Sequence, residues 1–535
     1  MPARRGRPGA DPLNRRGPAA LFLTGALFVL SYALGTPGYD VPGLPLVCLA
    51  PFLALAVSAR SARQAAWRGW VAGTAGSIPL YYWIAYTIAV QGKLGWAPGS
   101  LAAFLLSAYV GAYFSVAAAA AHRLEGRFGE RGLWLFPAVW TAVEMGRSHL
   151  FSGFPWMLLG YSVAGSATLR QAADLAGVHG LSFLLALSGV SVYLAGKRLS
   201  DRFPAKAAIP LIPGIAALLF LFLYGRAGSA NPAGPAARVP EVRVAIAQGG
   251  IDQSVKWDPG NQLATLEIYG ELTRKARDAG AQVVVWPETA APFFYGWEAG
   301  LSRRLDAIAV SGGIPVIFGA PWYDPAGGGK FYNSVFHMDA RGVVLGRYDK
   351  RHLVPFGEYI PLRSVLFFLS KLTAGEEDFS SGTGPALFPV GSRAVAASVC
   401  YEALFPALIR EGVLGGAAWL VNVTNDAWFG DTVAPHQHLA MARMLCVEFR
   451  RPMVRAANSG ISAVIDGDGG VTASLGLFRR GVFVAAIRPA TGETVYAKTG
   501  EIFGISCSIL TVLAFIFPLR GTHGIRNAGR ENNGA

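Results

Sequence analysis

The sequence predicts a polytopic α-helical membrane domain of about eight spans, followed by an α/β domain outside the membrane. Three observations lead to this fold class. Hydrophobic residues make up 52% of the 535 residues and charged residues only 15%, whereas soluble domains carry about 25% charged residues. The apolar residues form long runs in the first half, and nearly all of the net charge of +14 lies in that half and the C-terminal tail. Short β-rich runs alternate with helical stretches in residues 241–500.

The first elements are apolar runs that can cross a membrane, because a hydrocarbon core of about 30 Å requires roughly 20 apolar residues in a helix. The second and fifth runs are short. The fifth, which carries Glu144 and Arg147 near one end, could instead be a buried core helix. The expected spans are 19–35, 43–59, 69–91, 100–121, 132–148, 178–196, 207–225 and 502–519.

Basic residues mark alternate connections between these runs, and short loops rich in Lys and Arg stay cytoplasmic. They occur in the N-terminal tail, in the loops after the second, fourth and sixth spans, and in the C-terminal tail. Both termini are then expected in the cytoplasm, and residues 226–501 on the far side of the membrane. The same distribution argues against a nucleic-acid surface, which would need a basic stripe on a folded domain.

The chain therefore divides into successive segments. An uncleaved first span is favoured over a signal peptide, because no small-residue cleavage site follows it and further spans do. The expected segments are a basic cytoplasmic tail (1–18), a seven-span membrane domain (19–225), a linker rich in Gly, Ala and Pro (226–240), an external domain (241–500), the last span (501–519) and a cytoplasmic tail (520–535).

In the external domain, β-rich runs and amphipathic stretches predict a layered α/β fold. The expected helices are Gln262–Ala279, Leu301–Ser311 and His436–Arg451. The expected strands are Val242–Gln248, Gln282–Trp286, Pro315–Gly319, Ser334–Met338, Val343–Tyr348, Ala394–Val399, Ala418–Val423 and Ser462–Ile465.

Two apolar segments fit neither pattern. Phe151–Tyr161 is aromatic but interrupted by Gly and Pro, and it is either an interfacial belt or a lining for lipid tails. Leu362–Leu372 is too short to span a membrane and too apolar for an exposed loop. We expect it to be a lid that dips into the outer leaflet, with packing beneath the domain as the alternative.

Glu288, Lys350 and Cys400 each follow an apolar strand-like run of the external domain. Layered α/β domains place their sites at strand ends, so the three side chains can converge. Taken singly, each has a simpler explanation as an exposed carboxylate, a solvated Lys or a packed Cys. Exported domains usually pair their cysteines, and Cys446 is the one partner available to Cys400. An unpaired Cys400 is either buried or reactive.

The residues around these three positions carry a family resemblance. They read Trp-Pro-Glu-Thr at Glu288, Tyr-Asp-Lys-Arg-His-Leu-Val-Pro-Phe-Gly-Glu-Tyr at Lys350 and Val-Cys-Tyr-Glu at Cys400, and segments 422–430 and 455–460 add later motifs. This pattern resembles the nitrilase (carbon–nitrogen hydrolase) superfamily, which implies an αββα sandwich with a Glu-Lys-Cys triad.

The membrane half narrows the resemblance. With Phe154-Pro-Trp156 and Gly160-Tyr-Ser162, the chain resembles the apolipoprotein N-acyltransferase family from about residue 20 to 520. The resemblance implies a bacterial inner-membrane enzyme whose catalytic domain is periplasmic. It would move an acyl chain from a phospholipid, expected to be phosphatidylethanolamine, to the α-amine of a diacylglyceryl-cysteine apolipoprotein.

The resemblance also implies roles for individual residues. Cys400 would be the nucleophile that carries a thioester, and Glu288 the base that takes its proton. Lys350, with a backbone N–H just after Cys400, would stabilise the oxyanion.

Four further residues are carried over as supporting residues. Glu358 would orient Lys350 or the acceptor amine. Tyr401 and Glu402 flank the nucleophile, and Glu402 would hold an arriving ammonium group or pair with a nearby Arg. Trp257 would lie near the acyl or acceptor path, although a lone Trp more often belongs to a core.

No cofactor or metal is expected. A thioester drives amide formation without a nucleotide, and the His436-x-His438 pair lacks further ligands at metal-binding spacing, so a helix start is favoured. A monomer in the lipid bilayer, without a nucleic-acid partner, is expected. The alternatives are a membrane-tethered nitrilase-class amidase that uses water as acceptor, and a transporter. The transporter is disfavoured because Glu144 is the only plausible intramembrane charge.

Overall fold

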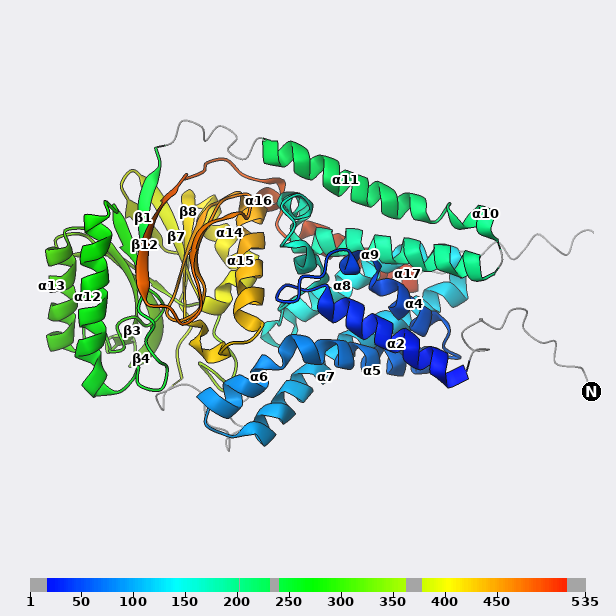
Figure 1. The fold of residues 1–535 in the computed structure, drawn as a ribbon, viewed down its shortest axis with the longest axis horizontal. Helices are drawn as coiled ribbons and strands as arrows, with labels where there is room; N and C mark the ends of the chain where they lie inside the picture. Colours follow the sequence, from blue (N-terminus) through cyan, green and yellow to red (C-terminus); the bar gives the residue numbers. More distant parts are fainter. Residues whose placement is uncertain (1–16, 202, 231–239, 362–377, 517–535) are drawn as a thin grey trace, which may run out of the picture.

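The computed structural model describes residues 17–201, 203–230, 240–361 and 378–516. A helical half and an α/β half lie side by side (Figure 1). The sequence expectations for the two tails, for most of the linker and for Leu362–Leu372 fall outside the described residues.

The helical half places a helix in each of the expected apolar runs. Among the described residues, three helical segments are long and apolar enough to cross a membrane, namely Trp96–Ser152, Leu169–Ser200 and Leu211–Gly228. The structure therefore contains a helical region with three candidate spans, and the expected number of eight stays a prediction. The main helices are α2 (Gly17–Leu34), α4 (Leu49–Val57), α5 (Ala62–Tyr81), α7 (Trp96–Phe128), α8 (Phe136–His149), α9 (Ala173–Ser200), α11 (Leu211–Ala230) and α17 (Ile502–Ile516).

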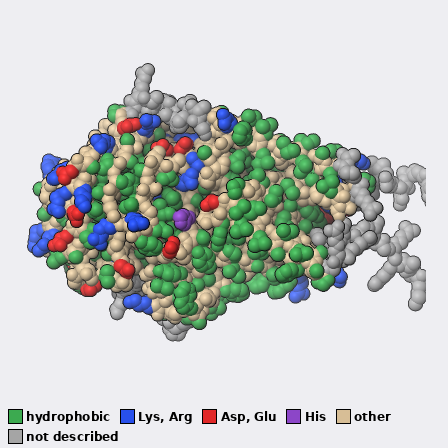
Figure 2. Space-filling model, viewed as in Figure 1, with side chains coloured by type: hydrophobic (Ala, Val, Ile, Leu, Met, Phe, Trp, Pro, Cys, Tyr) green, Lys and Arg blue, Asp and Glu red, His purple; other side chains and the backbone are tan. Residues whose placement is uncertain are grey.

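The surface of the two halves differs in chemistry. Figure 2 shows hydrophobic side chains over most of the helical half and charged side chains gathered over the α/β half. Phe22 in α2, Ile212 in α11 and Ile516 in α17 are each more than half exposed. Continuous exposed apolar surface of this kind marks contact with a membrane or a partner, in agreement with the predicted membrane half.

The α/β half contains two six-stranded sheets. The first has the order β12-β1-β2-β3-β4-β5 and the second β11-β10-β9-β8-β7-β6. The central strands β1, β2 and β3 run parallel in the first sheet, as do β7, β8 and β9 in the second. The strands are β1 (Val242–Gln248), β2 (Val283–Val285), β3 (Val316–Asp324), β4 (Lys330–Met338), β5 (Val344–Asp349), β6 (Leu387–Val390), β7 (Arg393–Val399), β8 (Ala417–Thr424), β9 (Met453–Ala457), β10 (Ser462–Ile465), β11 (Val471–Leu475) and β12 (Gly481–Ile487).

Alternation along the strands explains the layers, because successive side chains point to opposite faces of a sheet. In β1, Val244 and Ile246 pack in a buried cluster with side chains of β7, β8 and β9, between the two sheets. Ala245 and Ala247 face the other way, toward helices α12 (Gln262–Asp278) and α13 (Ala299–Gly312). The second sheet is covered by α14 (Pro406–Leu414) and α15 (Ala434–Phe449). The order is helices, sheet, sheet, helices.

The eight expected strands and three expected helices of this half are all present, but β3 extends to Asp324 and β4 already begins at Lys330, so the hairpin that they form is longer than expected. Sequence reasoning did not find β6, β9, β11 and β12. β6 and β11 are edge strands with alternating or partial exposure, and β9 is short and carries Arg455 in its centre.

Candidate active site

Glu288 lies in a tight turn just after β2, at the carboxyl end of the parallel strands. The turn is pressed against Gly319 of β3, whose N–H donates to the Pro287 carbonyl at 3.2 Å. A Cβ at Gly319 would lie 2.7 Å from the Glu288 Cα, so only glycine allows this approach. The Glu288 side chain is buried.

Lys350 follows β5 and is also buried. Its Nζ lies 2.8 Å from the Glu358 Oε2, and the same carboxylate oxygen accepts the Val354 N–H at 2.8 Å. Glu358 therefore closes the loop that follows Lys350 and fixes the ammonium group at the same time.

Asn333 joins the two carboxylates, and sequence reasoning missed it. Its Nδ2 donates to Glu288 Oε1 at 2.7 Å and to Glu358 Oε1 at 2.9 Å. Its backbone carbonyl accepts the Lys350 N–H at 2.8 Å. The available signal was a polar side chain on the apolar strand β4, where Asn333 is buried.

Cys400 begins a 3-10 turn, Cys400–Leu404, directly after β7. Its φ of 49° lies in the left-handed region that residues with a Cβ seldom adopt. The chain therefore bends sharply at Cys400, which is partly exposed and has no disulfide partner. A strained bend that presents a nucleophile is typical of functional sites.

Glu402 holds this bend rather than facing a substrate. It is fully buried. Its Oε2 accepts the Val399 N–H at 2.8 Å, and its Oε1 accepts the N–H of Arg351 at 2.7 Å and the Tyr348 hydroxyl at 2.8 Å. The carboxylate thus connects the Cys400 turn to the residue after Lys350, which leaves little capacity to receive an ammonium group.

Tyr401 and Trp257 lie at the border of the group. The Tyr401 ring stacks on Trp156 of the helical half, with centroids 6.4 Å apart, and its hydroxyl donates to the Gly153 carbonyl at 3.3 Å. Trp257 is half-buried in a turn after β1. The preceding residue, Lys256, is buried and donates to the Glu288 carbonyl at 3.0 Å, a contact that no sequence pattern indicates.

Burial and the neighbouring charges shift the pKa values of Glu288, Cys400 and Lys350. Burial raises the pKa of the Glu288 carboxyl, with Glu358 adding to the effect and Lys350 opposing it. Burial and the Glu288 carboxylate raise the pKa of the Cys400 thiol to about 12. Burial alone would lower the pKa of Lys350, but Glu358 and Glu288 raise it overall. Burial and the nearby carboxylates thus favour the protonated form of the Cys400 thiol and the charged form of the Lys350 ammonium.

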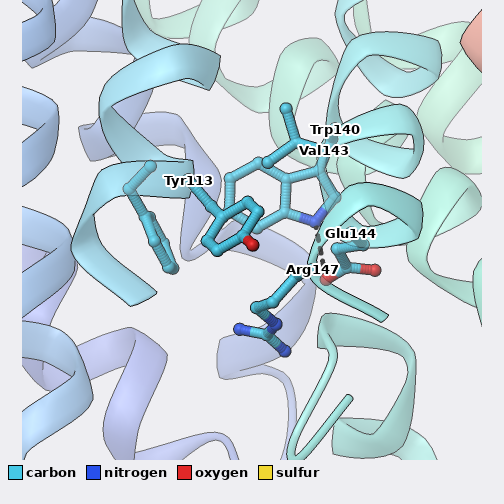
Figure 3. A pocket seen from close by; sticks show the side chains of 6 residues that line it. Tyr113, Trp140, Val143, Glu144 and Arg147 are labelled. Atoms are coloured by element: carbon cyan, nitrogen blue, oxygen red, sulfur yellow. Dashed lines mark hydrogen bonds between the residues drawn. The ribbon is translucent and has the colours of Figure 1, made fainter. Parts of the chain in front are cut away.

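The helical half contributes the segment that covers Tyr401. Trp156 is buried, and its carbonyl accepts the Tyr81 hydroxyl at 3.1 Å and Arg147 Nη2 at 3.2 Å. Glu144 Oε1 accepts Trp140 Nε1 at 3.0 Å and the Leu159 N–H at 2.8 Å. In Figure 3, Tyr113, Glu144 and Arg147 line a small cavity beside this contact.

The aromatic segment Phe151–Tyr161, expected to be an interfacial belt or a lining for lipid tails, takes part in the contact between the two halves. Its central part is buried between the two halves, because its polar backbone groups find partners on α8 and its rings pack against the α/β half. Phe151, at the start of the segment, is 87% exposed.

Comparison with known proteins identifies the family to which this chain belongs. A model of carbon–nitrogen hydrolases matches residues 243–496, and a model of the apolipoprotein N-acyltransferase N-terminal domain matches residues 24–191. A protein of Geobacter metallireducens named apolipoprotein N-acyltransferase is 38% identical over 518 residues, which cover 95% of this chain and 97% of the relative. The chain belongs to the apolipoprotein N-acyltransferase family.

Other similar proteins extend the comparison. A relative of the same name from Methylococcus capsulatus is 39% identical over 377 residues, which cover 69% of this chain and 71% of the relative. Among solved structures, a mutant amidase from Nesterenkonia sp. AN1 is 22% identical, with a TM-score of 0.35, and the match covers 46% of this chain and 92% of the amidase.

Proposed function

We propose that this chain transfers an acyl chain from a phospholipid to the α-amine of the N-terminal diacylglyceryl-cysteine of apolipoproteins, through a thioester on Cys400. The observation that carries the proposal is the buried group of Glu288, Asn333, Glu358 and Lys350, whose charges act on Cys400, in a chain of the apolipoprotein N-acyltransferase family.

In the first step, Glu288 takes the proton of the Cys400 thiol as the sulfur attacks the ester carbonyl of the phospholipid. A thiol of raised pKa needs such a base, since the thiolate is the nucleophile. Lys350, held as a cation by Glu358, stabilises the oxyanion together with the Tyr401 N–H. The ester C–O bond then breaks, Glu288 returns the proton to the leaving oxygen, and a lysophospholipid departs.

In the second step, the amine of the diacylglyceryl-cysteine attacks the thioester. The C–S bond breaks as the C–N bond forms, and Glu288 accepts a proton from the amine and passes it to the departing sulfur, so that Cys400 is regenerated as a thiol and Glu288 as a carboxylate. Donor and acceptor occupy the site in turn. The energy of the thioester is sufficient to form the amide, so the scheme requires neither metal nor nucleotide.

The cellular setting follows from the same proposal. Both substrates are anchored in a membrane, which fits the exposed apolar surface of the helical half. We place the protein, as a monomer, in the bacterial inner membrane with cytoplasmic termini, an external domain spanning 241–500 and phosphatidylethanolamine as donor.

Intact-protein mass spectrometry after incubation with phosphatidylethanolamine alone tests the proposal. The expected result is a gain of one acyl chain that hydroxylamine removes and that Cys400→Ala abolishes. Cys446→Ala is the matched control, because Cys446 is a free but buried thiol on α15. Glu288→Gln and Lys350→Ala should each slow adduct formation by about 10²-fold or more.

Absence of the adduct on folded protein, together with release of ammonia from small amides, would overturn the proposal in favour of a membrane-tethered amidase. An adduct that forms but is never passed to a diacylglyceryl peptide would overturn the assignment of the acceptor.

A further inference from the structure

A second buried polar cluster lies beneath Cys400, apart from the Glu288–Lys350 group. Its members are Asp426, His438 and Arg455, each at most 2% exposed. They come from separate elements of the second sheet and its helices: the turn after β8, helix α15 and strand β9. The mechanism above uses none of them, and burying a carboxylate and a guanidinium is costly unless close pairing and further hydrogen bonds offset the loss of hydration.

Arg455 organises the cluster. Its Nη2 lies 2.8 Å from Asp426 Oδ2, and its Nη1 donates to Asn422 Oδ1 at 2.6 Å. Because the Asn422 oxygen receives the guanidinium, its Nδ2 must point the other way, where it donates to Ser398 Oγ at 3.1 Å and approaches the Cys400 carbonyl at 3.4 Å.

His438 supplies a second donor to the same carbonyl. Its Nε2 lies 3.2 Å from the Cys400 oxygen, and since a carbonyl only accepts, that nitrogen carries the proton. Its Nδ1 lies 3.0 Å from Arg455 Nη2 and 3.1 Å from Asp426 Oδ1. Burial and Arg455 lower the pKa of His438, whereas Asp426 and the hydrogen bond to the Cys400 carbonyl oppose this shift. The proton on Nε2 faces the Cys400 carbonyl in either charge state of the ring.

The carbonyl of Cys400 and the N–H of Tyr401 belong to one peptide group. This group is planar and trans, so its C=O and N–H point in opposite directions. Asn422 Nδ2 and His438 Nε2 hold the Cys400 carbonyl in one direction. They therefore also fix the opposite direction, in which the Tyr401 N–H points. The bend at Cys400, with its φ of 49°, would otherwise relax toward a more favourable backbone conformation.

We propose that His438, together with Asn422, is a positioning residue that aims the Tyr401 N–H at the oxyanion by holding the Cys400 carbonyl. This inference rests on the proposed function in that it takes Cys400 as the acylated nucleophile. It extends to attack by Cys400 on any ester, because every such attack forms an oxyanion at the same place.

The helical half takes part in this arrangement. The Trp156 ring packs on the His438 ring with centroids 5.6 Å apart, and Phe429 contacts it at 6.1 Å. Trp156 Nε1 also donates to Gln437 Oε1 at 2.7 Å. The orientation of His438 is thus set by packing against Trp156 of the helical half and by the contact with Arg455 on β9.

The test compares two reactions of Cys400 in the full-length protein. Acylation by p-nitrophenyl butyrate forms an oxyanion and releases a burst of p-nitrophenolate. Alkylation by iodoacetamide is a displacement at carbon that forms no oxyanion. His438→Leu removes the donor, whereas His438→Gln retains an N–H₂ donor at similar reach. His436→Ala is the matched control, because His436 is exposed on the same helix.

In His438→Leu we expect the burst rate to fall by about 10²-fold, the size of effect that follows loss of one oxyanion donor, with alkylation within twofold of wild type. His438→Gln should recover most of the burst rate, and His436→Ala should match wild type. A parallel fall of both reactions in His438→Leu would show a purely structural role, and an unchanged burst would show no role. Either result overturns the inference.

These outcomes are separate from failure of the proposed function. If wild-type Cys400 reacts with p-nitrophenyl butyrate but never with phospholipid, the donor assignment fails, while the burst still decides whether His438 acts.

Discussion

At the scale of single residues, the candidate site concentrates negative charge. Two buried carboxylates, Glu288 and Glu358, share one Asn333 amide group and face one Lys350 ammonium. A thiolate at Cys400 would add a further negative charge, and low-dielectric surroundings magnify each repulsion. The site therefore favours the neutral Cys400 thiol at rest. In the proposed mechanism the thiol loses its proton to Glu288 during its attack on the ester.

This arrangement predicts an acid limit for acylation. Glu288 must be ionised to act as base, and burial together with Glu358 raises its pKa, so it protonates at a higher pH than a free Glu, near 4.3. We expect the single-turnover rate of thioester formation to fall on acidification with an apparent pKa above that value. The hydrogen bond from Asn333 lowers the pKa of Glu288, so Asn333→Leu should move the limit to still higher pH.

The measurement is the pH dependence of the p-nitrophenolate burst for wild type and Asn333→Leu. An apparent pKa of the acid limb equal to that of free Glu in wild type would contradict the role of Glu288 as base. A shift of this apparent pKa to lower pH in Asn333→Leu would contradict it as well.

Residues at strand ends could be predicted from the sequence, whereas residues that act from within strands and helices could not. Glu288, Lys350 and Cys400 stand out because an ionisable or nucleophilic side chain follows an apolar run. Asn333 and His438 are placed by contacts between segments far apart in the chain, and Lys256 is buried although Lys side chains are mostly exposed in proteins. No local pattern reports such contacts.

At the scale of elements, the connection between α8 and α9 shapes the face of the site. Phe151, Ser152 and Met157 all have positive φ, so this connection is held by its contacts rather than by local preference. Sequence reasoning recognised the segment as unusual, but composition could not tell that Trp156 would be buried against another part of the chain. Edge strands such as β11 were missed for the opposite reason, because partial exposure gives them no distinct apolar pattern.

Gly153 offers a test of this connection. Its φ is +84°, and a Cβ there would collide with the backbone of Ser148, which cannot move aside easily. Gly153→Ala should displace the carbonyl that accepts the Tyr401 hydroxyl and lower both the thermal unfolding temperature and the acylation rate, the latter by about tenfold, the loss that small misplacements near a site readily cause. Gly196→Ala in α9 is the control, since its Cβ would meet open space.

Differential scanning fluorimetry and the burst assay measure the two effects. Wild-type behaviour of Gly153→Ala in both would show that the connection does not fix Tyr401. The control should be as stable as wild type or more so, because Ala exceeds Gly in helix propensity.

At the scale of the whole molecule, the sequence separates the two halves but says nothing of how they join. Apolar runs predict the helical half and β-rich runs predict the sheets, because both patterns are local. The junction depends on polar side chains that look like ordinary surface residues. Arg450 is the clearest example: it follows α15 in the α/β half and reaches Asp174 and Gln171 at the start of α9.

Removal of Arg450 should loosen this junction. Its Nη2 lies 2.6 Å from Asp174 Oδ2, its Nε donates to the same carboxylate oxygen at 3.0 Å, and its Nη1 donates to Gln171 Oε1 at 2.5 Å. The partners are mostly buried, so Arg450→Ala leaves the Asp174 carboxylate with the Tyr224 hydroxyl but without its cation, and should cost about 2 kcal/mol of unfolding free energy. Arg488→Ala is the matched control, because its ion pair with Glu241 is exposed and such pairs contribute about 0–1 kcal/mol.

Thermal unfolding in detergent, followed by the fluorescence of the many Trp residues, measures the difference between the two variants. We expect a lower unfolding midpoint for Arg450→Ala than for Arg488→Ala, and a reduced burst in Arg450→Ala, because Trp156 and Tyr401 meet across the same junction. Equal midpoints would show that Arg450 does not contribute to holding the halves together. A lower midpoint with an unchanged burst would show that the junction stabilises the protein without positioning the nucleophile.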